Sequence, residues 1–327
     1  MSYEDNIYKC LSENDIASAS INACKDGSAL IPISYGTILP NSSEKVDENS
    51  IFELGSISKA VSAYLFLHFF DRNDLNLDTP ISQYYPSSYS AWNVNPNDPG
   101  FRSVTARQIL CHTSGFSNWN HWDPPVLRPF RFSPGDRFSY SGEGYMYLQK
   151  VFEYLSGTDL ESYARRHMFD YLGLSNTSFV WSDDFKNKLV QGSGKRNSDV
   201  GKYWEVPSCA FSLFSNSSEF TRLVLALMDD ETFRPIVQNM ISPQITLNQY
   251  CSWGLGVGIE HSSNGDYFWH WGDLGDYQCF FIASCNQQDS LMILTSGENG
   301  QRIFGFVCNQ ILETNFKCAD YRFLSKM

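Results

Sequence analysis

Residues 52–70, with the sequence FELGSISKAVSAYLFLHFF, decide the fold of this chain. After Ala60 the apolar residues fall on nearly every side of a helix, which predicts a buried helix over residues 57–71. The first turn of this helix nevertheless carries two serines and Lys59. Removing an ammonium group from water is costly, so we expect the protein to use this lysine for chemistry.

Composition predicts a folded globular protein and excludes several classes of partner. The chain has 327 residues, of which 42% are apolar and 18% charged, and its net charge of −12 argues against binding to nucleic acid or anionic membranes. No apolar run is long enough to span a bilayer, and the N-terminal residues show no secretory signal. We therefore expect a small-molecule or peptide-like substrate and no membrane span.

Cysteine and histidine usage points to a reduced protein without a metal site. The nine cysteines are odd in number and form no Cys-x-x-Cys pair, which indicates free thiols in a cytoplasmic protein. The six histidines are dispersed, so we expect no structural zinc and no cofactor. The chain also lacks a Gly-x-Ser-x-Gly elbow, which disfavours an α/β-hydrolase triad.

Strand-like runs occur near both ends of the chain, and amphipathic runs ended by glycine fill the middle. The simplest packing brings both ends into one antiparallel sheet. We predict a single α/β (α+β) domain over residues 1–327. Its sheet lobe comes from about residues 1–55 and 205–327, its mostly helical lobe from about residues 56–204, and its site lies in the cleft between them.

Three local patterns sharpen this expectation. Lys-Asp-Gly-Ser at residues 25–28 separates two apolar runs and predicts a hairpin. Residues 105–115 predict a short helix stopped by Gly115, and residues 301–316 predict a final helix.

Ser-x-x-Lys occurs twice, so the motif alone is weak. Ser42 and Lys45 lie in a polar stretch and are predicted to be solvated surface. Ser56 and Lys59 lie at the start of the buried helix, on one face of it and near its positive end. In the alternative interpretation, Ser56 only caps the helix and Lys59 extends out to solvent.

Several segments, in the same order, resemble the serine β-lactamase and penicillin-binding-protein superfamily, in particular its class C β-lactamase-like branch of esterases and peptidases. The resemblance rests on the Ser-x-x-Lys helix, on VTARQILCHTSGFSNW, on FSPGDRFSYSGEGYMYLQ and on DYFWHWGDLGDYQCFFIAS. It implies a β-lactamase/transpeptidase-like fold, with an antiparallel sheet flanked by helices and a mostly helical lobe.

The resemblance also implies roles for individual residues. Ser56 would be the nucleophile of an acyl-enzyme, and Lys59 would shuttle its proton. Tyr140 matches the tyrosine of the second motif, which acts as general acid or base. We expect Lys59 and Tyr140 to titrate as a coupled pair, because an adjacent ammonium favours the phenolate.

The third motif of the family matches His270, Trp271 and Gly272, which would contact the substrate. The backbone N–H groups of Ser56 and Asp273 would form an oxyanion hole. His112 is expected to organise its loop rather than to touch the substrate.

Two departures from the family bear on substrate choice. Gly142 stands where the family often has asparagine, and His270 stands where the members that act on β-lactams usually have lysine. Loss of that lysine removes a cation that would hold a β-lactam carboxylate, and Asp273 and Asp276 would repel one. We expect poor β-lactam turnover, and we expect an ester, amide or thioester to suit the site better.

The aromatic loop over residues 116–132 carries Trp119, Trp122, Phe130 and Phe132. It is expected to line an acyl pocket with Trp119 as a substrate contact, or else to form a packed lid.

The sequence therefore predicts a serine hydrolase that acts on a small ester or amide. It leaves open acyl transfer in small-molecule biosynthesis, β-lactamase or D-Ala peptidase activity, and a catalytically inactive ligand-binding relative.

Overall fold

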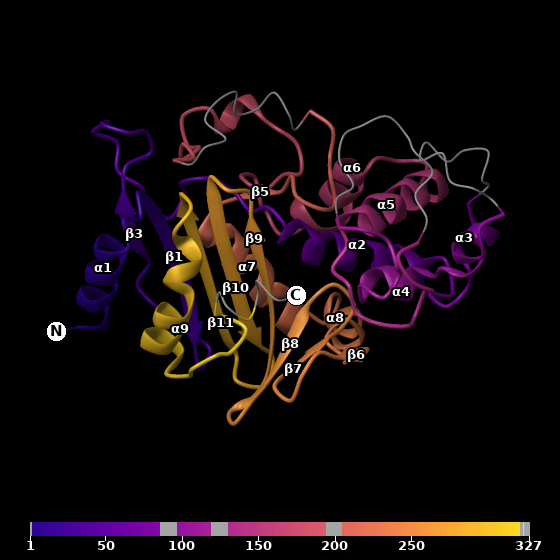
Figure 1. Ribbon diagram of the computed structural model, residues 1–327. Helices are drawn as coiled ribbons and strands as arrows, with labels where there is room; N and C mark the ends of the chain where they lie inside the picture. The colour runs from indigo at the N-terminus through magenta and orange to yellow at the C-terminus, as the bar shows by residue number, and fades with distance from the viewer. Residues whose placement is uncertain (1, 86–96, 119–129, 194–204, 321–322, 324–327) are drawn as a thin grey trace.

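The computed structural model describes residues 2–85, 97–118, 130–193, 205–320 and 323 (Figure 1). Nine strands form one antiparallel sheet in the order β2-β1-β11-β10-β9-β8-β7-β6, with β3 paired to β1. Their bounds are β1 Ser18–Lys25, β2 Ser28–Ala29, β3 Ile33–Gly36, β6 Ile245–Thr246, β7 Cys251–Trp253, β8 Gly258–Ser262, β9 Gly265–Asp273, β10 Tyr277–Ser284 and β11 Asp289–Ser296.

Two further strands, β4 (Phe52–Glu53) and β5 (Phe214–Ser215), pair separately. The helices are α1 Tyr3–Glu13, α2 Ser58–Arg72, α3 Pro99–Ser103, α4 Ala106–Leu110, α5 Gly142–Ser156, α6 Leu160–Ala164, α7 Ser217–Asp229, α8 Arg234–Met240 and α9 Phe304–Leu312, with short helical turns at η1 Ile81–Gln83, η3 Arg165–Phe169, η4 Asp183–Phe185 and η5 Gly300–Arg302. No helix in the described ranges has the length and apolar character needed to cross a bilayer.

The two ends of the chain meet in the sheet, as the sequence predicts. Strand β1 pairs with β11, so that Ile21 lies opposite Ile293. The predicted hairpin at residues 25–28 joins β1 to β2, with Asp26 and Gly27 both at positive φ. The predicted antiparallel sheet flanked by helices is therefore confirmed.

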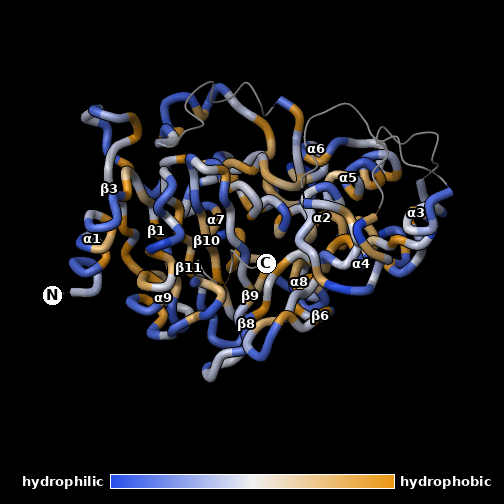
Figure 2. The backbone as a smooth tube through the Cα atoms, in the orientation of Figure 1, coloured by the Kyte–Doolittle hydropathy of each residue, from blue (hydrophilic) through white to orange (hydrophobic). Residues whose placement is uncertain are grey.

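Helices cover both faces of the sheet. Figure 1 shows α1 and α9 on one face, α7 on the other, and α2 to α6 grouped beside the sheet. Strand β10 is buried along its whole length, because Phe280 and Ile282 pack towards α9 while Cys279 and Phe281 pack towards α7. Burial on both faces explains why the strands read as nearly continuous apolar runs, and Figure 2 shows the hydrophobic colour concentrated along β10 and β11.

Helix α2 is the centre of the helical part. Twelve of its residues are buried, including Lys59. Its neighbours are α5, α6 and α8. Because packing surrounds the helix, an apolar sequence on nearly every side is what its position requires.

One helix and the ends of two others differ from the sequence-based expectation. Helix α1 was not predicted, and it begins with a reciprocal cap in which Ser2 and Asp5 bond each other's backbone N–H. Helix α4 ends before the left-handed residue His112 (φ +57°) rather than at Gly115. Helix α9 is shorter than predicted, because Glu313 adopts a left-handed conformation.

A buried carboxylate joins the sheet to the helical part. Glu219 on α7 is 5% exposed, and α7 packs on β1 and β11. Its oxygens accept hydrogen bonds from the backbone and side-chain N–H groups of Asn176 (3.0 and 2.8 Å) and from the Thr177 hydroxyl (2.8 Å). We propose that the two parts form one domain, because such bonds cross between them.

Glu219→Ala is expected to lower the free energy of unfolding by about 2 kcal/mol, since it removes the acceptor of the Asn176 backbone N–H and one acceptor each of the Asn176 amide and the Thr177 hydroxyl. Urea denaturation followed by circular dichroism measures this change. The matched control is Glu231→Ala, which removes an exposed carboxylate and should change the stability by less than about 0.5 kcal/mol. Equal effects of the two substitutions would contradict the structural role of Glu219.

Candidate active site

Ser56 lies in a tight turn just before α2. Gly55 adopts a left-handed conformation (φ +54°), which directs the chain from β4 into the helix. The Ser58 hydroxyl donates to the Gly55 carbonyl (2.6 Å) and accepts from the Leu213 N–H (2.9 Å). The turn is therefore fixed by a side chain other than that of Ser56, which stays partly exposed.

The alternative interpretation of the Ser-x-x-Lys motif does not match this geometry. Helix α2 has no side-chain cap, so Ser56 does not act as one. Lys59 is completely buried and does not reach solvent. Its ammonium nitrogen lies 3.1 Å from the Ser56 hydroxyl oxygen and 2.8 Å from the Ala210 carbonyl oxygen.

Burial gives Lys59 unusual acid–base properties. Desolvation lowers its pKa to about 7, although Cys209 opposes the shift. A substantial fraction of the Lys59 side chains is then a neutral amine at neutral pH. A neutral amine within hydrogen-bond distance of a hydroxyl can accept its proton.

Tyr140 completes the buried polar group. Its ring centroid lies 4.9 Å from the Lys59 nitrogen, and its hydroxyl lies near Ser56 but outside hydrogen-bond geometry. Burial raises the pKa of Tyr140 well above its ordinary value, and the Ser56 hydroxyl offsets only part of the rise. The expectation that Lys59 favours the phenolate is therefore corrected: a buried phenol without a hydrogen-bonded cation keeps its proton.

His112 holds the loop that carries Tyr140. The Ser139 N–H donates to the His112 carbonyl (2.8 Å), and the Ser141 N–H donates to its Nδ1 (3.0 Å). The imidazole also lies against the Tyr140 ring, with centroids 4.3 Å apart. Burial lowers the pKa of His112 well below its ordinary value, which keeps Nδ1 free to accept the bond. These contacts agree with the prediction that His112 organises the loop.

Strand β9 brings Gly272 and Asp273 against the turn that carries Ser56. Strand β8 pairs with β9 as far as Trp269, so the β8 side of residues 270–273 has no strand partner among the described residues. A side chain on Gly272 would collide with the Leu54 carbonyl and would lie 3.3 Å from the Ser56 nitrogen. A Cβ on Gly55 would lie 3.2 Å from the Asp273 nitrogen. The N–H groups of Ser56 and Asp273 are thus close enough to serve one oxyanion.

His270 and Trp271 lie around Tyr140. His270 is fully buried, and its Nδ1–H donates to the Trp271 carbonyl (2.7 Å). Burial and the nearby Lys59 charge lower the pKa of His270 to about 3, so His270 is neutral. It therefore provides no positive charge at the position where members that act on β-lactams usually have lysine. Trp271 is half-buried and stacks on Tyr140, with ring centroids 5.7 Å apart.

Asn118 is a site residue that sequence reasoning missed. Its side-chain oxygen accepts from the Gly142 N–H (3.0 Å), and its carbonyl accepts from the Glu143 N–H (3.0 Å). Its side chain is exposed beside the glycine that replaces the family's asparagine. The only signal in the sequence is its place shortly after His-Thr-Ser-Gly.

The aromatic loop is only partly described. Trp119 and Trp122 lie outside the described residues. Phe130 is partly buried and packs against the core and against Phe116, with ring centroids 4.6 Å apart, which fits a packed lid at this position. Phe132 lies under the guanidinium group of Arg137 (4.7 Å).

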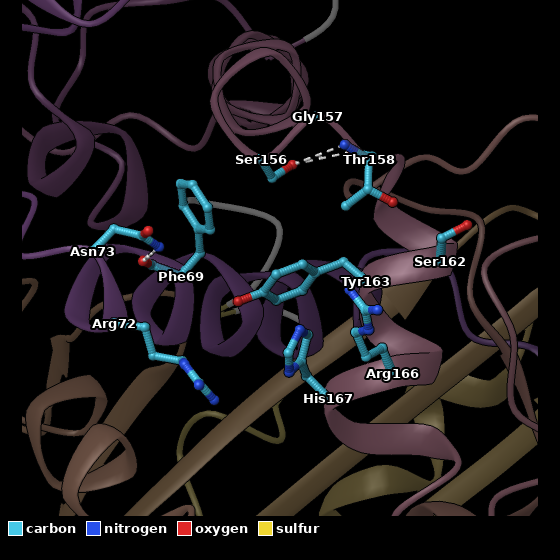
Figure 3. A pocket seen from close by; sticks show the side chains of 10 residues that line it. All are labelled: Phe69, Arg72, Asn73, Ser156, Gly157, Thr158, Ser162, Tyr163, Arg166 and His167. Carbon is cyan, nitrogen blue, oxygen red and sulfur yellow. Dashed lines mark hydrogen bonds between the residues drawn. The ribbon is translucent and has the colours of Figure 1, made fainter.

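A separate cavity of about 740 Å³ lies at the other end of α2 (Figure 3). Figure 3 shows Arg72 and Arg166 on either side of His167. The cavity is lined by Phe69 near the end of α2, whereas Ser56 precedes its first turn. A helix of this length spans about 22 Å, so this cavity is not the place where the predicted site residues meet.

Comparison with known proteins gives consistent matches. A family model described as Beta-lactamase matches residues 4–305. A beta-lactamase from Pseudomonas fluorescens is 24% identical over 60% of this chain and 55% of its own length. Protein flp from Staphylococcus aureus (strain MW2) is 23% identical over 88% of this chain. The chain covers 61% of the length of that protein.

Solved structures support the same fold. An octameric penicillin-binding protein homologue from Pyrococcus abyssi has a TM-score of 0.82 at 19% identity, over 96% of this chain and 77% of its own. A class C beta-lactamase has a TM-score of 0.81 at 18% identity, over 95% of both chains. The predicted β-lactamase/transpeptidase-like fold is confirmed.

The lowered pKa of Lys59 predicts how fast Ser56 reacts at each pH. Labelling by diisopropyl fluorophosphate, followed by intact mass, should speed up between about pH 6 and 8 and level off above. The neutral amine is the base, and it forms as the pH rises through about 7. Lys59→Arg keeps a cation that does not deprotonate, so labelling should fall at least about 100-fold. A rate that still rises at pH 10 would contradict the lowered pKa.

The two bonds from His112 predict a positioning role for this residue. His112→Gly permits the left-handed backbone but removes the ring and its acceptor, so labelling of Ser56 should slow about 100-fold. His112→Asn tolerates the same backbone and restores an acceptor near Nδ1, so it should recover most of the rate. The midpoint near pH 7 should be unchanged in both variants. Equal rates for the two variants would exclude the Ser141 bond as the cause.

Proposed function

The chain belongs to the beta-lactamase family, and we propose that it is a serine hydrolase that cleaves an ester or amide of a small molecule through an acyl-enzyme on Ser56. One observation carries the proposal. The partly exposed Ser56 hydroxyl lies 3.1 Å from a fully buried lysine whose pKa is lowered to about 7.

In the proposed first step, neutral Lys59 accepts the Ser56 proton while the Ser56 oxygen attacks the substrate carbonyl. The backbone N–H groups of Ser56 and Asp273 stabilise the oxyanion. The Tyr140 phenol gives its proton to the leaving group, and the Lys59 ammonium then returns a proton to Tyr140. The raised pKa of Tyr140 suits a proton donor.

Water completes the reaction. A water molecule gives a proton to Lys59 and attacks the acyl carbonyl. The bond between the acyl carbon and the Ser56 oxygen then breaks, Lys59 returns the proton to that oxygen, and the acid is released. If another nucleophile replaced water, the same steps would give acyl transfer. We propose hydrolysis as the main outcome.

A substrate without a carboxylate near the scissile bond fits the charges of this site. His270 is buried and neutral, so it offers no cation at the position of the family's lysine. Asp273 is exposed beside the proposed oxyanion hole. Both features disfavour β-lactams and peptides ending in D-alanine, because these substrates carry a carboxylate.

The cysteines support a reducing compartment. All nine are free in the structure, and seven of them are buried. We therefore propose a cytoplasmic location.

The experiment is intact-mass analysis after mixing with p-nitrophenyl esters from acetate to octanoate. Wild type should gain one acyl mass or release p-nitrophenol catalytically, and Ser56→Ala should do neither. The matched control is Ser42→Ala, which removes the serine of the second Ser-x-x-Lys and should behave as wild type. Ester turnover that survives in Ser56→Ala would refute the acyl-enzyme.

A chromogenic cephalosporin tests the charge argument separately. We expect its hydrolysis to be at least about 100-fold slower than that of the best ester, since the site lacks a partner for the carboxylate. Comparable rates would overturn the proposed substrate class while leaving Ser56 as the nucleophile.

A further inference from the structure

Two side chains beside the proposed oxyanion hole face the same way. Trp271 and Asp273 are two residues apart on β9, so they project from one face of the strand, about 7 Å apart. Trp271 is half-buried and Asp273 is exposed. Gly272 lies between them and packs against the turn of Ser56. The aromatic ring and the carboxylate therefore lie next to each other on the face of β9 opposite the one that Gly272 turns towards Ser56, and Trp271 meets the site through its contact with Tyr140.

The Asp273 carboxylate is held in place by neutral groups. One oxygen accepts from the Gly275 N–H (2.8 Å), and the other accepts from the amides of Gln278 (3.2 Å) and Gln301 (2.9 Å). A carboxylate offers about four acceptor positions, so one is left for a ligand. No lysine or arginine in the described part of the chain forms an ion pair with Asp273.

Among the described residues, neither Lys59 nor His270 offsets this carboxylate. Lys59 is fully buried and partly neutral at neutral pH, and His270 is neutral. The chain as a whole carries a net charge of −12. A cationic ligand therefore gains from both local and long-range attraction.

We infer that the site selects substrates whose leaving group carries an alkylated ammonium, with the Trp271 indole and the Asp273 carboxylate as its two contacts. Aromatic rings attract organic cations through their π faces, and the carboxylate adds a charge partner. The cation belongs on the leaving-group side, because Trp271 stacks on Tyr140, the proposed proton donor to the leaving group. This inference rests on the proposed function and adds the substrate class.

The experiment compares two esters of equal shape. Acetylcholine carries the ammonium group, and 3,3-dimethylbutyl acetate has a carbon atom in place of its nitrogen. We expect kcat/KM, measured by release of acetate, to be about 10-fold higher for acetylcholine. The ratio should fall as ionic strength rises, because salt screens exposed charges.

Variants assign the preference to the two side chains. Asp273→Asn and Trp271→Leu should each bring the ratio of the two esters to within about twofold of one, whereas Trp271→Phe should keep part of the preference. The matched control is Asp266→Asn, which removes the same charge from an exposed position on β9 about 23 Å away. Its ratio should equal that of wild type.

The outcomes separate the inference from the proposed function. If both esters are cleaved at equal rates, the cation contact is refuted and the hydrolase proposal stands. If neither ester is cleaved, calorimetric titration of Ser56→Ala with choline and with 3,3-dimethylbutanol decides the inference alone. Tighter binding of choline that is lost in the Ser56→Ala, Asp273→Asn double variant supports it, and equal binding of the two alcohols overturns it.

Discussion

The burial of Lys59 is the constraint on which the rest of the site depends. An ammonium group away from water is expensive, and this one has the Ser56 hydroxyl and the Ala210 carbonyl as hydrogen-bond partners. The rings of Tyr140 and Tyr145 lie nearby and exclude solvent. The energetic cost of burial is expressed as a lowered pKa, and this shift makes the lysine a base at neutral pH.

Close backbone packing joins this lysine to the sheet. Gly272 permits β9 to pack against the Leu54 carbonyl, and Gly55 permits the turn that presents Ser56. Reaction at Ser56 thus combines Lys59, a base on α2, with the backbone N–H groups of Ser56 and of Asp273 on β9. His112 adds the third part by bonding the residues on both sides of Tyr140. A preorganised site of this kind requires no rearrangement of its donors during reaction.

Much of the fold could be predicted from sequence because its signals are local. The buried helix, the hairpin at residues 25–28 and the strands after residue 250 follow from apolar patterns and glycine positions. Helix α1 was missed because its sequence is polar and only its cap marks it. The end of α4 was missed because His112 adopts a left-handed conformation that sequence alone assigns to glycine.

The sequence predicted which residues form the site but not their burial or their pKa values. Ser56, Lys59 and Tyr140 were found through their motifs, and the structure brings them together. The direction of the Tyr140 pKa shift was predicted wrongly, because the shift depends on burial rather than on the neighbouring lysine. The burial of His270 and the Asn118 contact to Gly142 also depend on tertiary packing. Sequence patterns record which groups are present, whereas solvation depends on residues distant in the chain.

The central claim is that Lys59 is a partly neutral base at neutral pH, and its pKa can be measured directly. Proteins labelled with ¹³C and ¹⁵N on lysine, with Lys59→Arg to assign the signal, permit a titration of the Lys59 side chain by NMR. The structure predicts a midpoint near pH 7. A midpoint above pH 10 would show a lysine that stays charged throughout the physiological range, and would contradict its role as the base for Ser56.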